Sequence, residues 1–144
     1  CTPKARLAYT TKISGPLLDR IDIHVEVPAL DYGELSRTEP AEPSEEIRRR
    51  VIAAREYAAE RTDGAVTCNG LMTPSDIRRF CRMDESGGKL MQTAYDKFAL
   101  SARAYDRILK VARTAADFDK SEIIRKEHIG LALQLRSMNK KYWQ

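Results

Sequence analysis

The sequence has no hydrophobic run long enough to cross a membrane, and it lacks the charged and apolar segments of a secretory signal at its start. A membrane-spanning helix needs roughly 18 consecutive apolar residues. We therefore expect no membrane contact and no export, which together favour a cytoplasmic protein. The first of the 144 residues is Cys rather than Met, which suggests a segment of a longer protein.

Residues that form disulfides, bind metals or break helices are also scarce. The three cysteines, Cys1, Cys68 and Cys81, are far apart and form no CxxC pair, so we expect reduced thiols rather than a disulfide framework. His24 and His128 have no Cys or acidic neighbours at metal-ligand spacing, so no metal site is predicted. Only 7 Gly and 6 Pro accompany abundant Ala, Arg, Glu and Leu, which is typical of a mostly helical domain.

The motifs that bind nucleotide phosphates are missing from these residues. Gly88-Lys89 is the one Gly-Lys pair, but a Walker A loop would need Gly at 83 and Ser or Thr at 90, where Met83 and Leu90 stand. No hydrophobic run ends in the paired acids of a Walker B strand. We therefore expect the isolated segment to hold no cofactor and to hydrolyse no ATP.

The positive charge is concentrated in the second part of the chain. The net charge is +4, with 5 basic and 6 acidic residues in 1–40 and 20 basic and 15 acidic residues in 41–144. This balance permits an anionic partner such as nucleotide or nucleic acid. Residues 48–50 and 78–79 are arginine clusters that either face DNA or form solvated helix faces. The basic and aromatic residues 140–143 either bind nucleic acid or pack on the helices.

One strand is predicted, over residues 21–27. Its β-branched residues alternate with polar ones and share one face: Ile21, Ile23, Val25 and Val27. Because a single strand cannot satisfy its backbone hydrogen bonds, we expect its sheet partners outside this segment or in another chain. Residues 28–44, with three prolines among polar residues, indicate a loop or linker.

About five helices are predicted after this linker, from apolar residues that recur at helical spacing. The first covers 45–61 with Ser44 as its N-cap, and the second begins at Thr73 in a capping-box pattern with Asp76. Gly87-Gly88 is expected to end that region, followed by helices over 89–99, from a cap at Ser101 onward, and a last one ending near residue 137. The expected buried positions include Ile47, Val51, Ala54 and Ala58, then Ile77, Phe80 and Cys81, then Leu90, Ala94 and Phe98, then Tyr105, Ile108, Leu109, Ala112 and Ala116, and finally Ile129 and Leu133. The predicted fold class is mainly α, a helical bundle preceded by a short strand remnant of an α/β core.

Two long motifs carry a specific resemblance. Residues 13–28, ISGPLLDRIDIHVEVP, resemble the end of the AAA+ core in the magnesium-chelatase-like ATPases, and residues 101–114, SARAYDRILKVART, resemble the lid helix of the same family. His128-Ile129 and Arg136-Ser137 also fit, and the resemblance extends from residue 1 to about 143. It implies that 1–30 end the ATPase core, that 31–44 form a linker, and that 45–144 form the helical lid domain.

The resemblance implies an ATPase that assembles into a ring, usually a hexamer, and binds ATP and Mg²⁺ between subunits. Its phosphate-binding and Mg²⁺-binding motifs are expected upstream of these residues. The competence-protein branch of the family processes DNA, including branch migration, and the wording KISGPLLDRID favours this branch. The magnesium-chelatase branch instead drives insertion of Mg²⁺ into a porphyrin. A free-standing helical module that binds DNA or protein is the third interpretation.

The resemblance also assigns roles to two arginines. Arg20 is expected to be the arginine finger, whose guanidinium neutralises charge on a neighbouring subunit's γ-phosphate. Arg103 is expected to be the sensor-2 arginine, which contacts nucleotide phosphate from the start of the lid helix. The alternatives are an ion pair with Asp19 or Asp22 for Arg20, a solvated surface position for Arg103, and Arg107 or Arg113 in the sensor-2 role.

Overall fold

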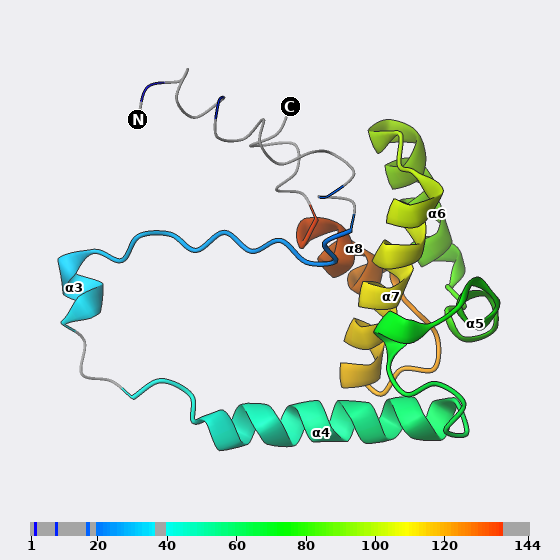
Figure 1. Ribbon diagram of the computed structural model, residues 1–144, viewed down its shortest axis with the longest axis horizontal. Helices are drawn as coiled ribbons and strands as arrows, with labels where there is room; N and C mark the ends of the chain where they lie inside the picture. The colour runs from blue at the N-terminus through cyan, green and yellow to red at the C-terminus, as the bar shows by residue number, and fades with distance from the viewer. Residues whose placement is uncertain (1, 3–7, 9–16, 18–19, 37–39, 137–144) are drawn as a thin grey trace.

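Helices surround one central helix in the computed structural model, which describes residues 2, 8, 17, 20–36 and 40–136 (Figure 1). In chain order the elements are α3 (Tyr32–Leu35), α4 (Ser44–Arg61), the 3-10 helix η1 (Asn69–Leu71), α5 (Pro74–Phe80), α6 (Glu85–Phe98), α7 (Ala102–Phe118) and α8 (Lys126–Gln134). The predicted mainly helical fold is confirmed. Within the described ranges, no helix combines the length and the apolar character needed to span a bilayer.

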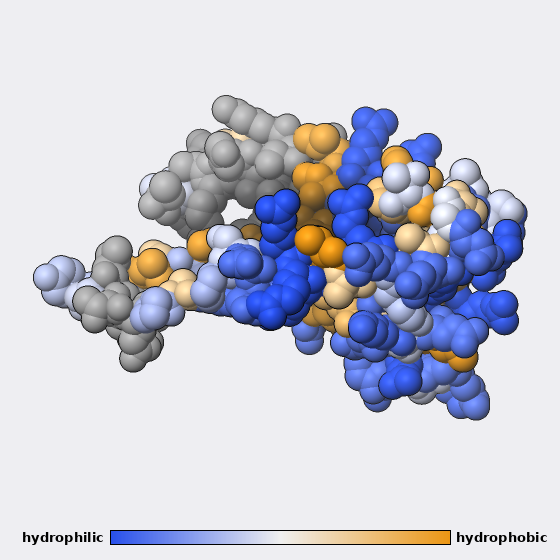
Figure 2. Space-filling view, turned by 90° about the horizontal axis from the view of Figure 1, so that it is seen from below, coloured by the Kyte–Doolittle hydropathy of each residue, from blue (hydrophilic) through white to orange (hydrophobic). Residues whose placement is uncertain are grey.

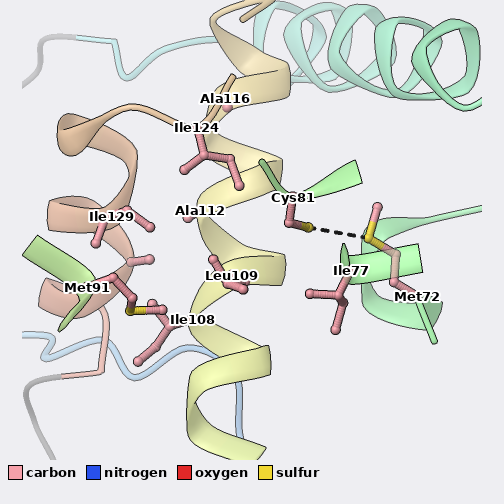
Figure 3. Close-up of a cluster of buried hydrophobic side chains, with 11 residues drawn as sticks. Met72, Ile77, Cys81, Met91, Ile108, Leu109, Ala112, Ala116, Ile124 and Ile129 are labelled. Atoms are coloured by element: carbon pink, nitrogen blue, oxygen red, sulfur yellow. Dashed lines mark hydrogen bonds between the residues drawn. The ribbon is translucent and has the colours of Figure 1, made fainter. Parts of the chain in front are cut away.

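The central helix is α7, which packs against α8, α4, η1 and α5, while α6 packs against α8. Its buried face, as predicted, includes Ile108, Leu109, Ala112 and Ala116, which recur at helical spacing (Figure 3). Both alanines are 0% exposed, because small side chains let the neighbouring helices approach α7 closely. The surrounding elements complete the core with Met72, Ile77, Cys81, Met91, Ile124, Ile129 and Ala132.

Two predicted helix starts are confirmed by their caps. The Thr73 hydroxyl accepts a hydrogen bond from the Asp76 N–H at 3.3 Å, and the Asp76 carboxylate accepts one from the Thr73 N–H at 2.8 Å. This reciprocal pair is a capping box. The Thr73 hydroxyl also donates to the Asp76 carboxylate at 2.7 Å, and this hydrogen bond, together with the one from the Thr73 N–H, lowers the pKa of Asp76. At α7, the Ser101 hydroxyl accepts from the Ala104 N–H at 3.2 Å.

The predicted break at Gly87-Gly88 is wrong, because both glycines lie inside the first turns of α6. Asp84 caps this helix by accepting a hydrogen bond from the Gly87 N–H at 2.6 Å. A Cβ atom on Gly87 would stand 2.9 Å from Asp84 Oδ1 and 3.3 Å from the Ile124 carbonyl oxygen. Gly87 is therefore explained by close approach of the Ile124 loop rather than by helix termination.

Helix α4 differs from the prediction at its start and in its burial. Pro43 is the N-cap and Ser44 is the first helical residue, with no side-chain cap. Ala54 is buried, but Ile47 and Val51 are 44% and 39% exposed. The reason is that only the later part of α4 reaches the bundle, whereas its start projects beyond it (Figure 1). Figure 2 views this side, where a mostly hydrophilic surface is interrupted by patches of hydrophobic residues.

Two further findings concern the predicted linker and the end of α6. The predicted linker 31–44 contains one helical turn, α3. Ala94 is buried as predicted, but Phe98, which was predicted to lie on the same buried side, is 37% exposed. Gly87 and Met91 complete the buried side of α6. Phe98 is the last residue of α6, where the chain turns through a left-handed residue, Ala99 with φ 46°.

Residues 21–27 form no strand within the described parts of the chain, and the backbone bends at Asp22. The predicted common face stays open, with exposures of 40%, 47%, 65% and 84% for Ile21, Ile23, Val25 and Val27. The segment instead contacts the end of α8. The His24 N–H donates to the Leu135 carbonyl at 2.7 Å, and Arg136 Nη1 donates to the Ile21 carbonyl at 2.8 Å. The expected strand therefore lacks a partner edge here, and the location of its sheet stays a prediction.

Candidate functional site

A groove of about 420 Å³ lies between the N-terminal segment, the start of α5 and the first half of α7. It is lined by Arg20, Met72, Pro74, Ile77, Arg103, Asp106, Arg107 and Lys110. Four of these side chains are cationic and one is acidic, while the α5 residues form an apolar wall. Clustered cations with few acids attract anions, and guanidinium groups form strong hydrogen bonds with phosphate.

The first half of α7 supplies most of this charge. Arg103, Arg107 and Lys110 stand at positions i, i+4 and i+7, so they share one face of the helix. Arg103 is the second residue of α7, and the positive end of the helix dipole adds to its field. Lys110 is oriented by a hydrogen bond of 3.0 Å from its Nζ to the Gly70 carbonyl. Sequence reasoning did not include Lys110, although its spacing from Arg103 predicts the shared face.

Arg20 reaches the same groove from the N-terminal segment. Its N–H donates to the Leu17 carbonyl at 3.0 Å, and two residues later Asp22 forms an ion pair with Arg107. The structure thus brings together Arg20 and Arg103, the two arginines singled out from the sequence. Among the described residues, Asp22 pairs with Arg107 rather than with Arg20, the alternative considered from the sequence. Asp19, the other alternative, lies outside the described residues.

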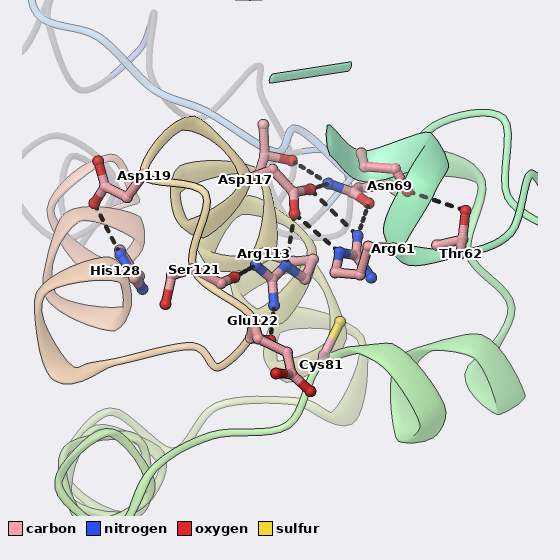
Figure 4. Close-up of polar contacts among 12 residues, drawn as sticks. Arg61, Thr62, Asn69, Cys81, Arg113, Asp117, Asp119, Ser121, Glu122 and His128 are labelled. Atoms are coloured by element: carbon pink, nitrogen blue, oxygen red, sulfur yellow. Dashed lines mark hydrogen bonds and ion pairs between the residues drawn. The ribbon is translucent and has the colours of Figure 1, made fainter. Parts of the chain in front are cut away.

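A second polar cluster is buried beside α7, around the carboxylate of Asp117 (Figure 4). Asp117 Oδ1 accepts hydrogen bonds from the Nε atoms of Arg61 and Arg113, both at 3.0 Å. Asp117 Oδ2 accepts from Asn69 Nδ2 at 2.6 Å. The side chains of Arg61, Arg113 and Asp117 are 8%, 0% and 1% exposed. The cluster ties the end of α4 and η1 to α7.

Arg113 is committed to this cluster. Its Nη1 donates to the Glu122 carbonyl at 2.8 Å, and its Nη2 donates to the Ser121 carbonyl. Burial lowers the pKa of Arg113, and the adjacent Asp117 carboxylate opposes that shift. Arg113 therefore braces the loop after α7 and does not line the groove, unlike Arg107, the other alternative for the sensor-2 role.

The two histidines have separate surroundings. His128 is buried, accepts the Arg125 N–H at its Nδ1 at 2.9 Å, and contacts Asp119 through Nε2 at 3.0 Å. His24 lies in the docked N-terminal segment, where burial and Arg136 lower its pKa. In the residues that the structure describes, no three His, Cys, Asp or Glu side chains come together as a metal site.

Comparison with protein families identifies the chain. Residues 41–136 match the family model of the magnesium chelatase subunit ChlI C-terminal region. The chain belongs to this magnesium chelatase ChlI family. Residues 1–35 match a second model, described as magnesium chelatase, subunit ChlI. The resemblance carried by residues 13–28 and 101–114 is thereby confirmed, and Arg20 and Arg103 fall one in each of the two matched regions.

Several curated proteins resemble this ChlI-family chain over most of its length. The uncharacterized protein YifB of Escherichia coli is 38% identical over 97% of the chain. Competence protein ComM of Haemophilus influenzae is 37% identical over 95% of the chain. An uncharacterized protein of Mycobacterium bovis is 36% identical over 81% of the chain. The chain spans only about a quarter of these relatives, namely 27%, 26% and 23% of their respective lengths.

Proposed function

We propose that this ChlI-family chain is the C-terminal segment of an AAA+ ATPase that assembles into a ring and couples ATP hydrolysis to DNA remodelling. The observation that carries the proposal is the groove in which Arg20 and Arg103 meet. Similarity to competence protein ComM supports the DNA-processing branch. In this proposal the helical bundle acts as the lid that responds to the state of the nucleotide.

Arg20 and Arg103 have different roles in the proposal. In the proposal, Arg20 meets a nucleotide held by a neighbouring subunit of the ring. There its guanidinium stabilises the charge that develops on the transferred phosphoryl group. Arg103, fixed in the first turn of α7, contacts a phosphate and transmits its presence to the core through that helix.

The described residues fit one part of an Mg-ATP site and not the other. The cations of the groove suit phosphate oxygens, and ATP supplies the phosphoryl group that is transferred. No cluster of acidic side chains in the described residues suits Mg²⁺. The proposal therefore assigns phosphate contacts to this segment and places the metal ligands elsewhere in the intact protein.

A magnesium-chelatase motor is the second candidate function, because both matching family models carry that description. In this alternative the same ATPase segment would drive insertion of Mg²⁺ into a porphyrin. The two candidates differ in what stimulates ATP turnover by the intact protein. Stimulation by DNA supports the first, and dependence on a porphyrin and its chelatase partners supports the second.

The test compares Arg20→Ala and Arg103→Ala with the wild type in the intact ring-forming protein. Arg20→Ala should leave ATP binding largely unchanged and slow hydrolysis by about 10³-fold, as expected for an arginine finger. Arg103→Ala should weaken ATP binding as well as turnover. ATP binding is measured by fluorescence titration, and hydrolysis by phosphate release.

Arg55→Ala is the matched control, since Arg55 is an exposed arginine of α4 that does not line the groove. This variant should hydrolyse ATP at the wild-type rate. Near-normal turnover of Arg20→Ala would show that Arg20 is only a surface arginine, and the proposed finger role would be abandoned.

A further inference from the structure

A separate pocket of about 250 Å³ lies beside the buried Asp117 cluster and opens between α5, the end of α4 and the loop after α7. Its lining consists of Arg61, Arg79, Phe80, Arg82, Glu122 and Ile123. None of these residues lines the Arg20–Arg103 groove. Three arginines, one aromatic ring and a single acid thus converge on a recess that the proposed nucleotide chemistry does not use.

The buried base of this pocket carries more positive than negative charge. Two guanidinium groups, of Arg61 and Arg113, share the single carboxylate of Asp117. Arg61 donates hydrogen bonds from Nε to Asp117 and from Nη2 to Asn69. Its buried Nη1 has no hydrogen-bond partner among the described residues. An unpaired buried charged donor is costly, so a nearby anion would stabilise this arrangement.

The rim of the pocket adds two more cations. Arg79 and Arg82 are exposed, and in the described ranges neither forms an ion pair. The charge of Arg79 nevertheless makes a minor contribution to the lowered pKa of Asp76. Phe80 is half-buried, with the guanidinium carbons of Arg79 and Arg61 lying 4.8 Å and 5.7 Å from its ring centroid. Cations interleaved with an aromatic ring are the elements with which proteins bind the phosphates and bases of unpaired strands.

We infer that this pocket, called here the Phe80 pocket, holds a phosphate of single-stranded DNA, with an adjacent base in contact with the Phe80 ring. The inference rests on the DNA arm of the proposed function and assigns a contact site to it. Arg79 and Arg82 bind the phosphate oxygens from the rim, and Arg61 contributes its field from beneath. A recessed phosphate next to an open base edge is available in a single strand, whereas duplex bases stay stacked on each other.

The experiment measures binding of a fluorescein-labelled oligothymidylate of about 20 nucleotides to the intact protein, by anisotropy at several salt concentrations. The Arg79→Ala/Arg82→Ala double variant should bind at least about tenfold more weakly, because two charge-assisted contacts are lost. Its slope of log affinity against log salt should fall by about 0.7, because both arginines bind the same phosphate. Phe80→Leu keeps an apolar side chain and should weaken binding with little change of that slope.

Arg78→Ala is the matched control, because Arg78 is an exposed arginine of the same helix that does not line the Phe80 pocket. It should bind DNA within about twofold of the wild type, and all variants should keep the basal ATPase rate. Equal weakening by Arg78→Ala would show that only general charge matters and would overturn the inference. The inference would also be overturned if the double variant lost binding to an oligoglutamate probe but not to DNA, which would indicate an acidic protein partner.

Two failures are distinguishable. If the wild type binds oligothymidylate and the double variant binds it equally well, the Phe80 pocket is not the contact site, while the proposed function stands. If the intact wild-type protein binds no DNA at all, the DNA arm of the proposed function fails together with this inference.

Discussion

Replacing Asp117 with Asn tests whether the buried arginine cluster depends on its single carboxylate. In the wild type, Oδ1 of Asp117 accepts from the Nε atoms of Arg61 and Arg113, and Oδ2 accepts from Asn69 Nδ2. An Asn at this position keeps one carbonyl oxygen but places an NH₂ donor where Oδ2 stood. That donor would then face the NH₂ donor of Asn69, across what is a 2.6 Å hydrogen bond in the wild type.

The expected cost follows from the burial of all three charged groups. The side chain of Asp117 is 1% exposed and that of Arg113 is 0% exposed, so water cannot replace the lost charge. Removing one partner of a buried ion pair typically costs about 3–5 kcal/mol. We therefore expect Asp117→Asn to lower the free energy of unfolding of the 144-residue chain by about that amount, a large part of the roughly 5–15 kcal/mol of a whole domain.

The assay is urea unfolding followed by far-ultraviolet circular dichroism. The free energies of unfolding are compared when the variant and the wild type show the same dependence of that free energy on urea concentration. Asp119→Asn is the control, because Asp119 is the neighbouring carboxylate whose side chain is 68% exposed and contacts His128. It should cost no more than about 1 kcal/mol. A loss below about 1.5 kcal/mol for Asp117→Asn would refute the argument that this carboxylate holds two buried arginines in place.

Three further predictions concern other parts of the chain. Gly87→Ala should destabilise the fold by about 1–3 kcal/mol, because its Cβ would stand 3.3 Å from the Ile124 backbone oxygen as well as 2.9 Å from the cap carboxylate of Asp84. Gly88→Ala, with open space around its Cβ, should stabilise it by about 0.5–1 kcal/mol in the same assay. Burial raises the pKa of Cys81 to about 11, so iodoacetamide at pH 8 should label the exposed Cys68 first and Cys81 about a hundredfold more slowly than a thiol of pKa 9.0, and equal labelling by mass spectrometry would contradict this. The pKa of His24 is lowered from 6.5 in the docked segment, so protonation of its ring favours the undocked segment. Docking of residues 20–24 should therefore be complete above about pH 6.5 and weaken below it. An NMR titration midpoint of the His24 ring at or above 6.5 would refute this.

The sequence by itself determined the features that depend on neighbouring residues. Helical spacing gave the buried face of α7, and the Thr73 and Ser101 starts followed from local side-chain chemistry. The two long motifs also indicated the ChlI family, because they are specific strings of adjacent residues. These features are local, since caps and helix faces are fixed within a few positions along the chain.

Only the tertiary structure decided the features that join distant residues. Gly87 looked like a helix end, and only the approach of Ile124 shows why a glycine is needed inside α6. Arg113 lies on a regular helix, yet its burial with Asp117 and Arg61 depends on how α4 and η1 pack against α7.

The two candidate arginines illustrate the same division. Sequence motifs identified Arg20 and Arg103 separately, but their meeting in one groove required the N-terminal segment to dock beside α7 through the Asp22–Arg107 ion pair. The exposed apolar face of residues 21–27 is likewise a tertiary outcome, because a strand is completed only when another strand supplies its backbone partners. Local patterns specify helices and caps, whereas burial, ion pairing and strand formation depend on the partner that the fold brings into contact.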